Sequence, residues 1–112
     1  MSRITSHVLD TSKGKPAAGI PVILFQYDNN NWIEMSSTTT NKDGRITDFL
    51  AKDIALPNGI YKLKFMIKEY FDAMGAQTFY PFIEVIFEIT GNEHYHVPLL
   101  LNPFGYSTYR GT

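Results

Sequence analysis

Cysteine is absent from the 112 residues of the sequence. Its absence excludes a disulfide framework, a thiolate metal site and a cysteine nucleophile. A chain without cysteine is compatible with a reducing compartment, where disulfides are rare. The N-terminal segment lacks the apolar run of a signal peptide, and no later stretch is long enough to span a bilayer as a helix. We therefore expect a cytoplasmic protein with no membrane partner.

A strong charge of either sign is also missing. Ten Lys and Arg residues against eleven Asp and Glu give a formal net charge of -1, and the basic residues are scattered along the chain. Nucleic-acid binding needs a basic surface that displaces counterions from phosphates, so we expect no nucleic-acid partner. Apolar residues make up 44% of the chain, enough for a packed interior. Length and composition together predict one domain over residues 1–112.

Short segments of alternating apolar and polar residues recur along the chain, with turn residues between them. This pattern is typical of an all-β protein and predicts a two-sheet antiparallel β-sandwich of about eight strands. One short helix is expected over residues 68–75, with Gly75 as its stop. The expected strands cover residues 3–9, 20–27, 32–40, 45–49, 60–67, 83–90, 94–101 and 106–109.

The C-terminal segment predicts two strands joined by the turn at residues 102–105. Side chains alternate between the two faces of a strand, so His94 and His96 share one face of the first of these strands. We expect the opposite face to be buried, because it carries Tyr95, Val97, Leu99 and Leu101. The segment after the second strand, residues 109–112, is dense in groups that bind anions or donate hydrogen bonds. A terminal segment frays unless something holds it, so we expect this tail to lie in a site.

The three histidines of the chain are its main candidates for proton transfer near pH 7. His7 falls on the polar face of the first strand, opposite Ile4 and Val8. A lone histidine on such a face is commonly a surface residue. Arg45 follows an Asp-Gly turn, where a surface charge is equally common.

Several motifs favour a function in a site, rather than a surface position, for these residues. The segment His96-Val-Pro-Leu-Leu-Leu101 and the tail Tyr109-Arg-Gly-Thr112 closely resemble the end of the 5-hydroxyisourate hydrolases, the enzymatic branch of the transthyretin family. That family ends on Tyr-Arg-Gly-Ser, so Thr112 stands where the family has serine. Three earlier motifs also resemble transthyretin-like sandwiches: Gly14-Lys-Pro16, Thr40-Asn-Lys-Asp-Gly-Arg45 and Gly59-Ile-Tyr-Lys-Leu63. With them the resemblance covers essentially the whole chain.

The resemblance implies both an activity and its residues. The activity is hydrolysis of 5-hydroxyisourate, the unstable product of urate oxidation in purine catabolism. The implied catalytic residues are His7, Arg45 and His96; the implied substrate-binding residues are His7, Arg45, Tyr109 and Thr112. The resemblance also implies a homotetramer, built as a dimer of dimers with sites at the subunit interface.

The chemistry of the reaction fits this set of residues. Opening a cyclic amide with water requires a base for the water, an acid for the leaving nitrogen and donors for the oxyanion. Two imidazoles in different protonation states can fill the first two roles, and the sequence leaves open which histidine is the base. The guanidinium of Arg45 is planar and permanently charged, which suits a flat, carbonyl-rich ring.

The position of these residues also predicts assembly. They all fall on the polar side of strands whose other side supplies the core, and the outer face of one small sandwich is too shallow to exclude water from a small heterocycle. Two-fold symmetry would set the same face of two subunits opposite each other and form a channel. Pro98 and Leu100 would then be interface residues.

Other interpretations remain open. His94 and His96 are spaced like ligands of three-His zinc sites, with His7 or an acidic residue as the third ligand. However, Pro98 and Leu100 continue that face and no Asp or Glu holds an obvious partner position, so we expect no metal and no cofactor. We expect His94 to lie behind the site residues or in solvent. The alternative functions are a transthyretin-like carrier of a small aromatic ligand, which would lack the His, Arg, His set and the tail, and a non-catalytic structural module.

Overall fold

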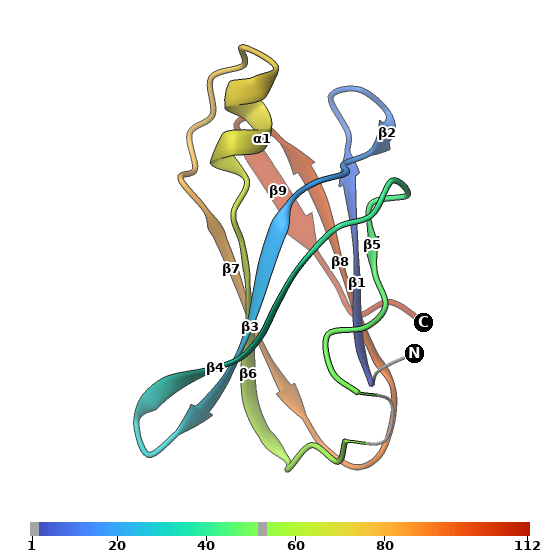
Figure 1. The fold of residues 1–112 in the computed structure, drawn as a ribbon, viewed down its shortest axis with the longest axis vertical. Helices are drawn as coiled ribbons and strands as arrows, with labels where there is room; N and C mark the ends of the chain where they lie inside the picture. The colour runs from blue at the N-terminus through green and yellow to red at the C-terminus, as the bar shows by residue number, and fades with distance from the viewer. Residues whose placement is uncertain (1–2, 52–53) are drawn as a thin grey trace.

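The computed structural model describes residues 3–51 and 54–112, which form two sheets packed face to face (Figure 1). One sheet has the strand order β2-β1-β8-β9, with β5 also paired to β1, and the other has the order β4-β3-β6-β7. The elements are β1 (Ile4–Asp10), β2 (Lys15–Pro16), β3 (Pro21–Asp28), β4 (Asn31–Thr39), β5 (Arg45–Ile46), β6 (Gly59–Phe65), α1 (Lys68–Ala73), β7 (Ile83–Ile89), β8 (Tyr95–Asn102) and β9 (Gly105–Thr108). The predicted two-sheet sandwich with one short helix is confirmed.

The core forms where alternation predicts it. Ile4 and Val8 of β1 are fully buried, and the predicted inner face of β8 is buried along its length. β3 lies in the middle of its sheet, between β4 and β6, and is apolar on both faces: Val22 and Leu24 are buried in the core, and Ile23 and Phe25 are half-buried on the outer face. Burial of these side chains between the sheets is the main force that holds the sandwich together.

The helix and the hairpin tip follow from local sequence. Gly75 has a φ of 67° just after α1, and the backbone N–H groups of Gly75 and Ala76 donate to the last carbonyls of the helix. This is the glycine stop that the sequence predicts. At the tip between β3 and β4, Asn29 and Asn30 both have positive φ, which asparagine tolerates better than most residues.

The structure differs from the prediction in three places. β1 and β8 run parallel, whereas the other strand pairs of the described chain are antiparallel. These two strands come from opposite ends of the chain, so no short turn dictates their direction. The strand expected over residues 45–49 pairs with β1 only at Arg45 and Ile46, and Phe49 then turns into the core. The two-residue strand β2 was not expected.

In the part of the chain that the structure describes, no helix has the length and apolar character needed to cross a membrane. The outer face of the β1–β8 sheet carries the polar residues of interest, and it is built from both ends of the sequence (Figure 1).

Candidate active site

β1 and β8 bring the two predicted site histidines onto one face. In the parallel register Thr5 pairs with His96, and His7 pairs with Pro98. Residues paired in register point to the same side of a sheet. His7 and His96 therefore share the outer face, and both side chains are half-buried there.

Arg45 reaches the same face through a tight turn. Asn41 Oδ1 accepts hydrogen bonds from the backbone N–H groups of Asp43 at 2.9 Å and Arg45 at 3.0 Å. Gly44 has a φ of 73°, and its carbonyl accepts a hydrogen bond from the Val8 N–H at 2.8 Å. A Cβ atom at Gly44 would lie 2.5 Å from the Val8 carbonyl oxygen, so only glycine lets the turn approach β1 this closely. β5 then pairs Arg45 directly with His7.

The C-terminal tail is laid across His96. The Gly111 N–H donates to the His96 carbonyl at 2.8 Å, and the two residues form an isolated antiparallel bridge. A Cβ atom at Gly111 would lie 2.6 Å from His96 Cδ2, so a larger residue here would displace the imidazole ring or the tail. The Arg110 guanidinium lies 4.2 Å from the centre of the Tyr95 ring and pairs with Glu93 at 3.3 Å. These contacts hold the tail at Arg110 and at Gly111.

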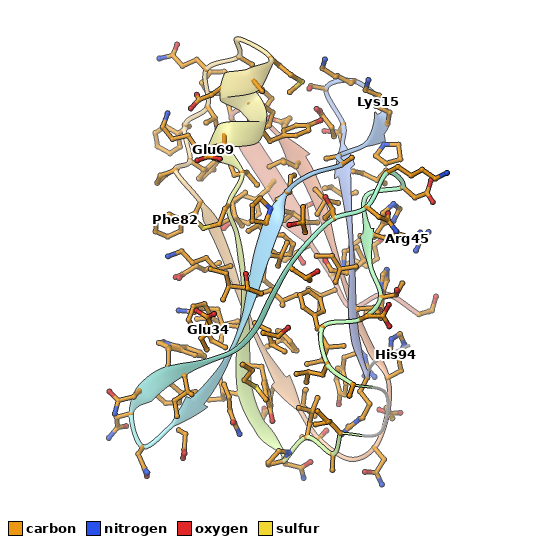
Figure 2. The ribbon with its side chains drawn as sticks, in the orientation of Figure 1. Lys15, Glu34, Arg45, Glu69, Phe82 and His94 are labelled. Carbon is orange, nitrogen blue, oxygen red and sulfur yellow. The ribbon has the colours of Figure 1, made fainter. Side chains whose placement is uncertain are left out.

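The turn, the two strands and the tail enclose one pocket of about 340 Å³. Figure 2 shows Arg45 on this outer side of the sandwich, away from Glu34 of β4 and from Phe82, which precedes β7. All five residues predicted for the site line the pocket: His7, Arg45, His96, Tyr109 and Thr112. Leu9, Pro98 and Leu100 supply its apolar wall.

The environment of the pocket favours neutral imidazoles. Burial lowers the pKa of His7, and the positive charge of Arg45 lowers it further, against the opposing influence of the Asp43 backbone and carboxylate. Burial likewise lowers the pKa of His96, followed by Arg45 and by the imidazoles of His7 and His94. A neutral imidazole has a free lone pair, which is the form that a general base requires.

One residue of this region is absent from the sequence-based prediction. The hydroxyl of Thr5 lies 2.7 Å from His96 Nδ1 and 3.0 Å from His94 Nε2, so it joins the two imidazoles. Thr5 is buried, although it lies on the outer face of β1. Its position two residues before His7 was a usable signal, but only the strand pairing shows that it meets His96.

His94 itself is exposed, and with Thr5 and Thr47 it lines a smaller cavity of about 300 Å³ that shares Arg45, His96 and Thr112 with the first pocket. Among the described residues, no three His, Asp or Glu side chains come together in a way that could hold a metal ion. A separate, more apolar pocket of about 420 Å³ lies beyond the tail, against Val85, Phe87 and Tyr95, and contains no histidine.

Known proteins are similar to this chain in sequence and in fold. The chain is 44% identical over 110 residues to the 5-hydroxyisourate hydrolase of Salmonella typhimurium, covering 97% of this chain and 80% of the relative. The structure of Klebsiella pneumoniae 5-hydroxyisourate hydrolase superposes with a TM-score of 0.86 at 34% identity, covering 97% of this chain and 98% of that one. Sea bream transthyretin in complex with thyroxine superposes with a TM-score of 0.91 at 28% identity, covering 98% and 95%.

The fold alone does not separate the two kinds of relative, because a hydrolase and a thyroxine-bound transthyretin both match nearly the full chain. The family itself is unambiguous. The sequence profile described as "HIUase/Transthyretin family" matches residues 4–111. The chain therefore belongs to the HIUase/Transthyretin family.

Proposed function

We propose that this protein is a hydrolase that opens the cyclic amide of 5-hydroxyisourate, as part of urate degradation. The observation that carries the proposal is the pocket in which two imidazoles and a guanidinium, those of His7, His96 and Arg45, lie together beneath the C-terminal tail. Relatives more than 40% identical over nearly all of this chain are named 5-hydroxyisourate hydrolases, which supports the same activity here.

The proposed reaction is acid–base catalysis without a metal. One imidazole, neutral because its pKa is lowered, takes a proton from water as the water oxygen attacks the amide carbonyl. The Arg45 guanidinium stabilises the negative charge that develops on the carbonyl oxygen. The C–N bond then breaks, and a protonated imidazole gives its proton to the leaving nitrogen. Tyr109 and Thr112, which line the pocket, bind the polar edge of the substrate.

The alternative function is that of a small-ligand carrier, which the structural likeness to a thyroxine-bound transthyretin suggests. The composition of the pocket argues against it. A carrier site gains affinity mainly from apolar walls, with few polar groups. This pocket instead contains an arginine and two histidines, and the pKa of both histidines is lowered. Such perturbed groups in a cleft are more typical of catalysis than of ligand storage.

We infer further that a second subunit completes the site. The pocket lies on an outer sheet face, and in its apolar wall Leu9 and Leu100 are only half-buried while Pro98 is buried. A small ring bound there remains in contact with water on one side unless another molecule covers it. A two-fold axis through this face would set two equal pockets opposite each other, and pairing of two such dimers gives a homotetramer.

The activity itself is tested with freshly made 5-hydroxyisourate. Its absorbance should decay faster with the protein than in buffer, and His7→Asn and His96→Asn should each lower kcat by roughly 100- to 10,000-fold, the range for acid–base groups. Glu34→Gln, which changes an exposed charge on the other sheet, is the matched control and should keep wild-type turnover. Unchanged substrate decay with the wild-type protein rules the proposal out. Near-normal turnover in both histidine variants removes the acid–base assignment.

The pH dependence of kcat/KM tests the protonation states. Because burial and Arg45 lower the pKa of both imidazoles below 6.5, the neutral base persists at neutral pH and is lost only as the pH falls through a lower midpoint. Arg45→Gln removes a cation that lowers both pKa values, so its midpoint should move up. Arg45→Lys keeps the charge and should keep the low midpoint. A wild-type midpoint above 6.5 would contradict the account in which burial and Arg45 lower the pKa of the imidazoles and so keep them neutral.

The assembly is tested by light scattering coupled to gel filtration. The expected mass is that of four chains at the protein concentration of the activity assay, because the outer sheet face is covered only in an assembly. A fully active monomer would contradict the shared site and leave the pocket open to solvent during the reaction.

A further inference from the structure

The hydroxyl of Thr5 occupies an unusual place behind the pocket. It lies 2.7 Å from His96 Nδ1 and 3.0 Å from His94 Nε2, while the two imidazole rings are themselves 6.5 Å apart between centroids. The hydroxyl therefore lies within hydrogen-bond distance of both rings. Thr5 is 3% exposed, whereas His94 lies at the surface. The result is a continuous chain of hydrogen bonds from the pocket to solvent.

The number of hydrogens in this chain limits its arrangements. A hydroxyl has one hydrogen, so with two neutral imidazoles it donates to one ring and accepts from the other. In the first arrangement His96 Nδ1–H donates to Thr5, and Thr5 donates to His94 Nε2. In the second, His94 Nε2–H donates to Thr5, and Thr5 donates to His96 Nδ1.

The two arrangements give His96 opposite functions. In the first, its Nδ1 carries the hydrogen, so Nε2 has a free lone pair and can act as a base. In the second, Nε2 carries the hydrogen and can act as an acid. The orientation of the hydroxyl therefore selects the function of the nitrogen that is left for the substrate.

We propose that Thr5 is a positioning residue that couples His96 to His94 and passes protons between them. This inference rests on the proposed function of His96. When His96 Nε2 takes a proton from the attacking water, its Nδ1–H bond breaks and that proton forms a new O–H bond on Thr5. The original Thr5 hydroxyl proton moves to His94 Nε2. His94 gains one proton, Thr5 is unchanged, and His96 is neutral with its hydrogen now on Nε2.

The relay would serve the reaction in two ways. It converts His96 from a base to an acid within one turnover, ready to protonate the leaving nitrogen. It also keeps the positive charge off His96, whose pKa is lowered by the nearby Arg45 guanidinium. The charge lies instead on His94, an imidazole in contact with water. When His96 Nε2 gives its hydrogen to the leaving nitrogen, His94 Nε2 returns its proton to the Thr5 oxygen and the Thr5 hydroxyl proton passes back to His96 Nδ1. Both imidazoles are then neutral, as they were at the start.

A purely structural function of Thr5 makes different predictions. In that case the hydroxyl only satisfies buried polar atoms, and its removal should weaken folding without a specific effect on the chemical step. The neighbouring residue offers a matched comparison. Ser6 is equally buried and donates to the Val97 carbonyl at 2.7 Å, but it touches neither imidazole.

The test compares Thr5→Val, which keeps the shape of the side chain and removes the hydroxyl, with Thr5→Ser, which restores it. On 5-hydroxyisourate, Thr5→Val should lower kcat by roughly 10- to 100-fold, with KM changed little; this is the range found for residues that orient metal-bound histidines through the second ring nitrogen. Thr5→Ser should restore most of kcat, and Ser6→Ala should keep it. His94→Asn can still form a hydrogen bond but cannot take a proton, and it should lower kcat as Thr5→Val does.

Two results overturn the relay in an active enzyme: wild-type kcat in Thr5→Val, or wild-type kcat in His94→Asn. The second variant alters an exposed residue, so it tests the relay even if Thr5→Val fails to fold. A readout without substrate separates this inference from the proposed function. Nitrogen-15 NMR of the resting protein should show His96 Nδ1 hydrogen-bonded in the wild-type and Thr5→Ser proteins but not in Thr5→Val. If the wild-type protein is inactive but shows these NMR shifts, the hydrolase function is refuted and the coupling of His96 to His94 through Thr5 stands. If the His96 shifts in Thr5→Val are identical to those of the wild-type protein, the coupling itself is refuted.

Discussion

The parallel pairing of β1 with β8 is the contact on which the candidate site depends. It sets Thr5 beside His96 and His7 beside Pro98, so two imidazoles from opposite ends of the chain share one outer face. A slip of one residue would turn the side chains of one strand to the other face and bury a histidine in the core. Such a slip is opposed by the apolar side chains on the inner face, because Ile4, Val8, Val97 and Leu99 are buried only in the observed register. Core packing and site geometry therefore have the same cause.

Two glycines complete the site on this pair of strands by allowing the backbone to come close. Gly44 brings the turn that carries Arg45 against the Val8 carbonyl, and Gly111 brings the tail against the His96 ring. A methyl group at Gly44 would push the turn away from β1, and a methyl group at Gly111 would displace the His96 ring or the tail. Arg45 then stands beside both histidines, and its charge together with burial keeps their pKa low. The same closeness that assembles the pocket thus also sets the protonation states on which the proposed chemistry relies.

Much of this arrangement could be predicted from the sequence. Alternation identified the buried face of β8 and the polar face of β1, and the motifs at His96 and in the tail indicated the family. Local patterns could not show that β1 and β8 run parallel, because the direction of two strands far apart in sequence depends on the whole sandwich. The importance of Thr5 was hidden for the same reason: a threonine on a strand has no distinctive local pattern, and only its neighbour across the sheet makes it a link between His94 and His96.

A crystal structure with a stable purine analogue bound is the sharpest test of the proposed catalytic pocket. We expect the ring to lie between His7, Arg45 and His96, with a carbonyl oxygen about 3 Å from the Arg45 guanidinium, the distance of a charge-assisted hydrogen bond. We also expect a second subunit to cover the open side of the ring. An analogue bound instead in the apolar pocket against Val85 and Phe87, with the histidine pocket empty, would refute the catalytic pocket and favour a carrier.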